Sequence, residues 1–343
     1  MRGSVKVGVL GAGFISDYHI AGLQAAGAEV VSVFSQNGEK ARRKADQYGI
    51  PESCDNPAEI LARNEIAAVV IATPDFTHEA LAVAAAAAGK ATLLQKPMAP
   101  TSAAARRIIA AAAKAGVPLV VSFMHRYFEE VVQARQILVN GALGEISMVR
   151  QRNATPGADW AAWFYQKERV GGGVVLQLGV HGIDLLRQLF GEIAAVKAVT
   201  RLVQSEQTLV DGSVVEPNNE DLAIALYRFA SGTIAVHEMS YNEVAGTDRF
   251  RMEIYGARGT AWLRSERGRF ALVAPAVTGE AGWVPYDLPE APFGESHHRH
   301  VLAMVSGVAP VDASARDGLA ALLVAEAIYR SAENGGWTAV EPV

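Results

Sequence analysis

Three polar side chains that could act on a ligand recur along the stretch from Gly171 to Leu189, GGGVVLQLGVHGIDLLRQL. Gln177, His181 and Asp184 are spaced by four and three residues, which places them on one face of an α-helix. Apolar residues on the other faces indicate a buried helix, and burying unpaired polar groups costs stability. Two interpretations stay open: a histidine that braces the core, or a helix that directs an acid/base group at a ligand.

A lysine follows a second apolar segment. Ala91 to Leu94 is predicted to be a strand that leads into Gln95-Lys96-Pro97. In doubly wound sheets, ligands bind beyond the carboxyl ends of the strands, so a lysine there is expected to be functional rather than a solvated charge. The residues expected to converge at this edge are Ser35, Thr73, Pro74, Lys96 and Phe123.

The elements that must position this lysine resemble a dinucleotide-binding unit. A β-branched-rich strand, Val5 to Leu10, runs into Gly11-Ala12-Gly13-Phe14-Ile15-Ser16, a helix to about Ala26 and a strand from Val30 to Phe34. The first glycine allows the tight turn, and the second lets a pyrophosphate approach the backbone at the helix N-terminus. Ser16 replaces the third glycine and is small enough for close helix–strand packing. Later elements of this domain are expected to be a strand from Ala67 to Thr73, a helix ending at Gly89, a helix from Ser102 to Ala115 and a strand from Leu119 to Ser122.

The choice between NAD and NADP stays open at the end of the second strand. An Asp or Glu there binds the ribose hydroxyls and repels a 2′-phosphate, but this chain has Ser35-Gln36-Asn37. All three side chains can donate a hydrogen bond to either group.

After Phe123 the alternation of strands and helices stops, and a second domain is expected. Alternating apolar patterns there predict an antiparallel sheet, covered on one face by the helix that begins near Gly171. We expect its other face to mediate a homodimer or homotetramer. The predicted strands are Ile146 to Asn153, Ala195 to Val203, Asp221 to Phe229, Thr233 to Tyr241, Arg249 to Tyr255, Thr260 to Arg264 and Phe270 to Val273.

Length and composition fit two domains. The chain has 343 residues, and we expect a division into residues 1–122 and 123–343, with a C-terminal helix at 315–333 that packs back on the first domain. The predicted fold class is an α/β Rossmann doubly wound domain plus an α+β domain with an open, mostly antiparallel sheet.

Charge and cysteine content exclude several classes of protein. The net charge of −5, without a basic run, argues against a nucleic-acid surface. The single cysteine, Cys54, excludes an intramolecular disulfide and a multi-cysteine zinc site. The longest apolar run, Ala80 to Ala88, is too short for a membrane span, so a cytoplasmic protein is predicted. His297, His298 and His300 lack a nearby Cys or acidic residue, and no metal site is predicted there.

By its motifs the chain resembles the Gfo/Idh/MocA oxidoreductases, the glucose–fructose oxidoreductase and inositol dehydrogenase family, over nearly its whole length. The motifs are Gly11-Ala12-Gly13, Ala72-Thr73-Pro74 with His78, Lys96-Pro97, Phe123-Met124-His125-Arg126-Tyr127, Gly171-Gly172-Gly173 and Gly179-x-His181-x-x-Asp184. The resemblance implies a nicotinamide cofactor and a sugar, cyclitol or related polyol as substrate.

The resemblance also implies roles for individual residues. It assigns catalysis to Lys96, His181 and position 177: Lys96 polarises the reacting oxygen, His181 exchanges the proton and Gln177 bonds a second hydroxyl. Predicted substrate-binding residues are Asp184, Arg126, Asn153, Trp160, Trp163 and Tyr165, although the three aromatic ones fit loop packing equally well. Predicted cofactor-binding residues are Gly11, Gly13, Phe14, Ile15, Ser35, Gln36, Thr73, Pro74, His78, Gln95 and Lys96.

Two positions depart from the family pattern. Gln95 stands where the family usually has Glu, and Gln177 stands where many members have Asp. A carboxylate would favour the ammonium form of Lys96, so the amides predict a lower pKa for this lysine than in carboxylate-bearing relatives.

The leading interpretation is an NAD(P)-dependent dehydrogenase or reductase that acts on a hydroxyl/ketone pair. Two alternatives stay open. One is redox-assisted glycoside elimination with a held cofactor, which turns over without net change in NAD(P)H. The other is a non-catalytic nucleotide-sensing regulator, which the retention of Lys96 and His181 disfavours.

Overall fold

The computed structural model describes residues 4–243, 249–290, 292 and 294–343. It divides the chain into two compact units, and each is described by itself. The first comprises Met1–Tyr127 and Glu290–Leu319, and the second comprises Phe128–Pro289 and Ala320–Val343. Among the described residues, no helix combines the length and apolar character that crossing a bilayer requires.

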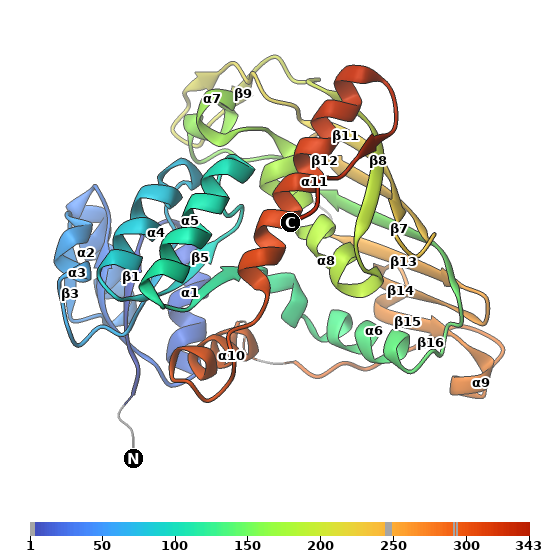
Figure 1. The fold of residues 1–343 in the computed structure, drawn as a ribbon, viewed down its shortest axis with the longest axis horizontal. Coiled ribbons are helices and arrows are strands. Elements are labelled where there is room, and N and C mark those ends of the chain that lie inside the picture. Colours follow the sequence, from blue (N-terminus) through green and yellow to red (C-terminus); the bar gives the residue numbers. More distant parts are fainter. Residues whose placement is uncertain (1–3, 244–248, 291, 293) are drawn as a thin grey trace. The chain divides into compact units, whose positions relative to one another are not determined.

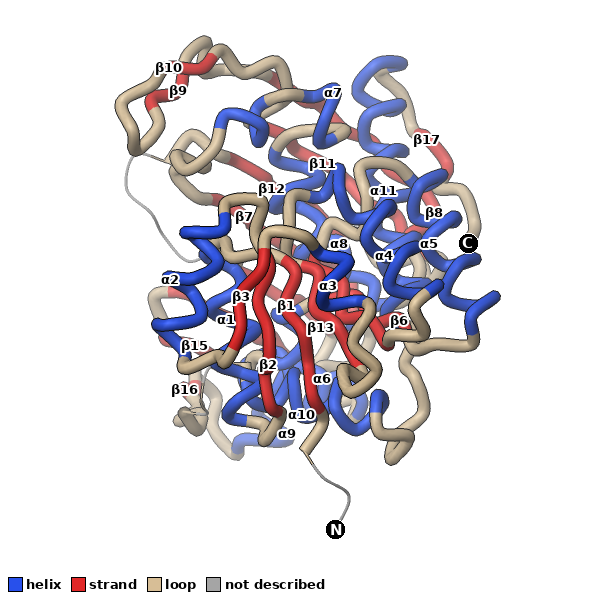
Figure 2. Tube along the Cα trace, turned by 90° about the vertical axis from the view of Figure 1, so that its left-hand side faces the viewer, coloured by secondary structure: helices blue, strands red, loops and turns tan. Residues whose placement is uncertain are grey.

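The first unit is built on a parallel six-stranded sheet in the order β3-β2-β1-β4-β5-β6 (Figures 1 and 2). This order is that of a doubly wound dinucleotide-binding sheet, in which the strand order reverses between β1 and β4. Its strands are β1 (Lys6–Leu10), β2 (Glu29–Phe34), β3 (Glu52–Cys54), β4 (Ala68–Ile71), β5 (Ala91–Gln95) and β6 (Leu119–Ser122). β4, β5 and β6 are buried throughout, as expected for strands covered on both faces.

Helices cover this sheet, and α4 and α5 pack side by side (Figure 1). The helices that lie wholly in the unit are α1 (Phe14–Ala25), α2 (Gly38–Tyr48), α3 (Pro57–Leu61), α4 (His78–Ala87), α5 (Ser102–Ala115) and α10 (Glu295–Val305), with 3₁₀ turns at Asp75–Thr77 and Met124–Tyr127. The left-handed glycines Gly49 and Gly116 end α2 and α5.

Residues 290–319 belong to the first unit, whereas the sequence placed them in the second domain. The reason is that α10 packs on α1 and contributes Val301 and Met304 to the apolar core formed by Val7, Ile20 and their neighbours. The first unit also extends to Tyr127 rather than ending at residue 122. The last long helix, α11 (Ser314–Asn334), begins in the first unit and continues in the second.

The second unit contains a mixed nine-stranded sheet in the order β16-β15-β14-β13-β7-β12-β11-β8-β17. Only the β7–β12 pair among its described strand pairs is parallel, so the predicted mostly antiparallel sheet is confirmed. The strands are β7 (Ile146–Ala154), β8 (Ile193–Arg201), β11 (Leu222–Phe229), β12 (Ile234–Ser240), β13 (Arg251–Gly256), β14 (Gly259–Ser265), β15 (Gly268–Val273), β16 (Val284–Pro285) and β17 (Thr338–Ala339). A separate hairpin joins β9 (Gln207–Thr208) and β10 (Val214–Val215).

Helix α8 packs against β7, which confirms that this helix covers the sheet (Figure 1). The stretch from Gly171 is not one α-helix: a π-helix, Val175–Gly179, precedes α8 (Val180–Phe190). The remaining helices of the unit are α6 (Glu129–Val139), α7 (Lys167–Val170), α9 (Pro275–Thr278) and a 3₁₀ turn at Ala162–Tyr165.

Candidate functional site

The glycine turn after β1 is shaped by two different requirements. Gly11 has φ of +120°, and a Cβ there would lie 2.5 Å from the carbonyl oxygen of Ala72, so the fold itself demands glycine. At Gly13, which precedes α1, a Cβ would meet nothing within 4 Å, and no side chain caps the helix. The N-terminus of α1 is therefore open to an anion, and this observation fits a dinucleotide pyrophosphate.

The third position of the turn is filled by a buried hydroxyl. The Oγ of Ser16 donates to the carbonyl oxygen of Gly13 at 2.5 Å, and the residue is fully buried. Phe14, by contrast, is 50% exposed at the start of α1. Serine is thus tolerated at the third position because its hydroxyl is satisfied by the preceding turn.

Of the three polar side chains at the end of β2, those of Ser35 and Asn37 make hydrogen bonds to the backbone among the described contacts. Asn37 caps α2, since its Oδ1 accepts from the backbone N–H of Lys40 at 3.0 Å. Ser35 Oγ accepts from the backbone N–H of Asn37 at 3.3 Å. Gln36 is exposed.

His78 joins the loops that follow β4 and β5. Its Nδ1 lies 3.1 Å from the carbonyl oxygen of Pro97, and its Nε2 lies 3.0 Å from that of Thr73. Burial lowers the pKa of His78 to about 4. The contacts show a buried histidine that holds together the two loops expected to bind the cofactor.

Gln95 anchors the backbone at the proposed catalytic lysine. Its Oε1 accepts from the backbone N–H of Lys96 at 2.7 Å, and the glutamine is only 6% exposed. The following Lys96–Pro97 peptide is cis. Thr73, Pro74, Gln95 and Lys96 therefore lie at the carboxyl ends of the neighbouring strands β4 and β5, as the sequence predicts for a doubly wound sheet.

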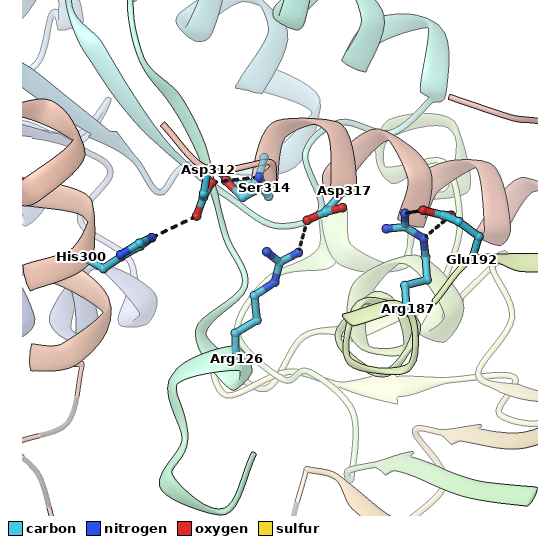
Figure 3. Close-up of polar contacts among 8 residues, drawn as sticks. Arg126, Arg187, Glu192, His300, Asp312, Ser314 and Asp317 are labelled. Atoms are coloured by element: carbon cyan, nitrogen blue, oxygen red, sulfur yellow. Dashed lines mark hydrogen bonds and ion pairs between the residues drawn. The ribbon is translucent and has the colours of Figure 1, made fainter. Parts of the chain in front are cut away.

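Arg126 is held by an ion pair within the first unit. Its Nη2 lies 2.8 Å from Asp317 Oδ2 at the start of α11, and the two side chains are only 10% and 12% exposed (Figure 3). The guanidinium also lies 5.0 Å from the centre of the Phe123 ring. Arg126 was expected to line a substrate cleft, whereas these contacts tie the segment after β6 to α11.

In the second unit, the three polar residues of the segment from Gly171 to Leu189 are all buried. Gln177 is 7%, His181 4% and Asp184 1% exposed. Gln177 lies in the π-helix, whereas the other two lie in α8, so the four-residue spacing does not correspond to one regular α-helical face. A π-helical turn widens the helix and is frequent at functional sites.

Glu220 fixes the start of this helix, a role that no pattern in the sequence indicates. Its carboxylate accepts the backbone N–H of Gly173 at 2.8 and 2.9 Å and that of Val175 at 3.1 Å. The hydroxyl of Tyr329 on α11 donates to the same carboxylate at 2.8 Å. Burial raises the pKa of Glu220, while these donors oppose the shift.

The triple glycine is explained by this arrangement. A Cβ on Gly172 would lie 1.9 Å from the Tyr329 hydroxyl, and one on Gly173 would lie 1.8 Å from the carbonyl oxygen of Glu220. Gly171 ends α7 in the left-handed conformation. The signal in the sequence was the glycine run itself, because three successive glycines imply a close approach by another part of the chain.

Asn153 on β7 lies against α8. It is fully buried, its Oδ1 accepts from His237 Nε2 at 2.8 Å, and its Nδ2 donates to the Arg249 carbonyl at 2.8 Å. A Cβ on Gly182 would lie 2.2 Å from this Oδ1. Asn153, which was predicted to bind substrate, is thus a buried residue whose amide bonds protein groups, and His237 with its partner Tyr227 belongs to the same core.

The aromatic loop before α7 divides into a packed and an exposed part. Tyr165 is buried, and its hydroxyl accepts from the backbone N–H of Ala158 at 3.0 Å, which makes it a loop brace. Trp160 is 44% exposed, and it and Trp163 pack edge-on against Phe164. Only the two tryptophans keep surface that a ligand could use.

Comparison with known proteins identifies both parts of the chain. Residues 5–123 match the family described as "Oxidoreductase family, NAD-binding Rossmann fold", and residues 131–262 match the "GFO/IDH/MocA C-terminal domain". The chain is 30% identical to a D-apiose dehydrogenase of Paraburkholderia graminis, covering 96% of this chain and 88% of that protein. It is also 30% identical to an inositol 2-dehydrogenase of Saccharopolyspora erythraea, covering 98% and 97%.

Solved structures show the same fold. A levoglucosan dehydrogenase in complex with NADH and levoglucosan superposes with a TM-score of 0.88 at 24% identity, over 99% of this chain and all of the other. The open α1 N-terminus, the strand order and the sequence matches agree. The chain belongs to the Gfo/Idh/MocA oxidoreductase family, with an NAD-binding Rossmann domain.

Proposed function

We propose that this oxidoreductase interconverts a hydroxyl and a ketone on a sugar, cyclitol or related polyol. The observation that carries the proposal is the set of buried polar side chains, Gln177, His181 and Asp184, on the helix of the second unit. Amide, imidazole and carboxylate groups together donate and accept the hydrogen bonds that the several hydroxyls of a polyol require. The named activities of the two 30%-identical relatives, on apiose and inositol, support the same substrate class.

A nicotinamide cofactor, when bound, would supply hydride transfer, and the residues of this chain supply position and a proton route. In the proposed mechanism, the Lys96 ammonium donates a hydrogen bond to the reacting oxygen. The imidazole of His181 takes up the hydroxyl proton during oxidation and returns it during reduction. Gln177 and Asp184 bind neighbouring hydroxyls, and Trp160 and Trp163 offer faces for C–H groups of the ring.

The test is a substrate screen with two variants. Protein with NAD or NADP is mixed with myo-inositol, D-apiose, levoglucosan and simple glycosides, and formation of reduced cofactor is followed by absorbance. Lys96→Met and His181→Asn are each expected to lower kcat by roughly 10²–10⁴-fold. Lys114→Met, which removes an exposed lysine of α5, is the matched control and leaves kcat unchanged. Unchanged turnover in both site variants would refute the assignment.

The alternatives give different results in the same screen. Release of sugar from a glycoside without net change in NAD(P)H indicates redox-assisted elimination. Cofactor binding without turnover on any polyol or glycoside indicates a nucleotide-sensing regulator. Replacing Gln177 by Asp is expected to raise the pH above which hydride transfer slows, because a carboxylate favours the ammonium form of Lys96, which is the active form in this mechanism.

We further propose that a second copy of the chain covers the outer face of the second sheet. Exposed apolar side chains repeat at alternate positions on adjacent strands there, with Val199 at 65%, Ile224 at 43% and Leu226 at 37% exposure. An apolar face of this kind on an open sheet favours an interface between protomers. Light scattering coupled to gel filtration is expected to show a dimer or tetramer, and Val199→Lys with Ile224→Lys is expected to give monomers.

A further inference from the structure

A buried line of side chains leads from the proposed catalytic lysine to α10 within the first unit. The backbone N–H of Lys96 donates to Gln95 Oε1 at 2.7 Å, and Gln95 Nε2 lies 3.5 Å from His19 Nε2, a long contact. His19 Nδ1 lies 2.9 Å from His298 Nε2, and His298 Nδ1 lies 2.7 Å from the carbonyl oxygen of Gly294. Both histidines are fully buried.

The direction of each hydrogen bond along this line follows from the Gly294 carbonyl at its end. A carbonyl oxygen only accepts, so His298 Nδ1 must carry a proton and donate to Gly294. In a neutral imidazole the other nitrogen then accepts, and His19 must donate from its Nδ1. His19 Nε2 is left as an acceptor facing the amide of Gln95, which has N–H groups to donate.

We propose that His19 and His298 are positioning residues: as a neutral, directional pair they orient Gln95, and Gln95 in turn fixes the backbone at Lys96. The expected effect of the pair on catalysis rests on the proposed role of Lys96, whereas the orientation of Gln95 by the two histidines does not. It also gives a reason for glutamine at position 95, where a carboxylate would face the lone pair of His19. A glutamate would require an additional proton on that ring.

Packing and charge support neutral rings. Gly22 lies against the pair, since a Cβ there would come within 2.2 Å of His298 Nδ1. Burial lowers the pKa of His19 well below its usual value and that of His298 to about 4. The ring of Tyr18 lies against both histidines and its hydroxyl bonds His297 at 2.9 Å, while His297 lies against His298. Arg126, Tyr127 and His300 surround His297 in turn.

The first experiment determines which imidazole nitrogens of His19 and His298 carry a proton. Long-range ¹H–¹⁵N NMR spectra of the full-length protein near pH 7 are assigned with His19→Asn and His298→Asn. Both rings are expected to carry one proton, on Nδ1, and Gln95→Glu is expected to add a second proton to His19 alone. A wild-type His19 protonated on Nε2, or a Gln95→Glu protein in which His19 stays neutral with its proton on Nδ1, overturns the proposal.

The second experiment uses kcat, KM and NAD affinity to test whether the histidine pair positions Lys96. His298→Leu is expected to lower kcat on the polyol that shows turnover about tenfold, while KM and NAD affinity change by less than about twofold. His298→Gln, which keeps an acceptor for His19, is expected to restore most of the rate. His297→Leu is the matched control, since His297 is equally buried and bonds Tyr18 instead; its kcat is expected to stay at the wild-type value.

These outcomes separate the two proposals. Failure of Lys96→Met to reduce turnover refutes the role of the lysine and leaves the NMR result to decide on the histidine pair. Equal losses of kcat in His298→Leu, His298→Gln and His297→Leu show a general packing defect and overturn the positioning role.

Discussion

The phenol of Tyr329 on α11 donates a 2.8 Å hydrogen bond to Glu220, whose carboxylate also receives the first backbone N–H groups of the helix that leads to His181. A carboxylate at a helix N-terminus satisfies donors that have no partner within the helix and interacts favourably with the helix dipole. The start of this helix is therefore set by two residues far away in the sequence.

Removing this carboxylate is expected to cost stability. Glu220→Ala leaves buried N–H groups without an acceptor, and we expect the free energy of unfolding to fall by about 1–3 kcal/mol. Urea denaturation measures the change, and Glu216→Ala, at an exposed position nearby, is the control with an effect within about 0.5 kcal/mol. Equal stability of the two variants would show that Glu220 is not an essential cap.

The two glycines beside this carboxylate should respond differently to alanine. Gly173→Ala places a Cβ against the backbone of Glu220, which cannot move without shifting the chain, so we expect poor folding. Gly172→Ala meets the end of the Tyr329 side chain instead, and Tyr329→Phe is expected to recover part of its lost stability. Thermal unfolding of the single and paired variants checks this, and a Gly173→Ala protein as stable as wild type would contradict it.

The Arg126–Asp317 pair is expected to matter more than an exposed pair. Arg126→Met leaves a largely buried carboxylate without its cation, which we expect to cost about 3 kcal/mol. In Arg43→Met the lost partner is Glu39, and the two side chains are 67% and 73% exposed, so the cost is expected to stay below about 0.5 kcal/mol. Denaturation midpoints of both variants give the comparison, and similar costs for the two would argue against the pair as a stabilising contact.

Gln36 is expected to control the choice of cofactor. Gln36→Asp places a carboxylate at the end of β2, where it repels a 2′-phosphate, so the affinity for NADP should fall about tenfold relative to NAD. Fluorescence titration with both cofactors measures the ratio. Gln47→Asp adds the same charge at an exposed position of α2 and should leave the ratio unchanged; an unchanged ratio in Gln36→Asp would place the discriminating group elsewhere.

Stability is expected to fall in mild acid because of His78. Its pKa is about 4 in the folded chain and 6.5 by its ordinary value, so between these pH values the unfolded state binds a proton that the folded state does not. The contribution is complete above pH 6.5 and is lost as the pH falls toward 4. His78→Gln should show a shallower decline of the unfolding free energy over this range, and parallel curves for the two proteins would be evidence against it.

Most strands of both sheets could be predicted from the sequence because their patterns are local, whereas the short strands β3, β16 and β17 were not predicted. Apolar β-branched runs predict the buried parallel strands, and strict alternation predicts β11 and β12 to within about two residues at each end. The helix Ser102–Ala115 was predicted at its observed bounds, and in the structure the Thr101 side chain caps its start while Gly116 ends it.

What the sequence could not give depends on contacts between distant segments. Nothing near Asn153 in the chain indicates that its amide bonds His237, and nothing near Arg126 indicates Asp317. The π-helix at Gln177 was missed because periodicity assumes a regular helix. The return of residues 290–319 to the first unit follows from which surfaces fit together, which spacing does not encode.

The core of the first unit has a consequence for how the protein is made. Val301 and Met304 fill an apolar space bordered by Val7 and Ile20, near the other end of the chain. A ribosome that has released the first 127 residues has thus delivered all six strands of that sheet but not the helix that seals it. The nascent nucleotide-binding unit therefore lacks part of its apolar core until translation has passed Met304.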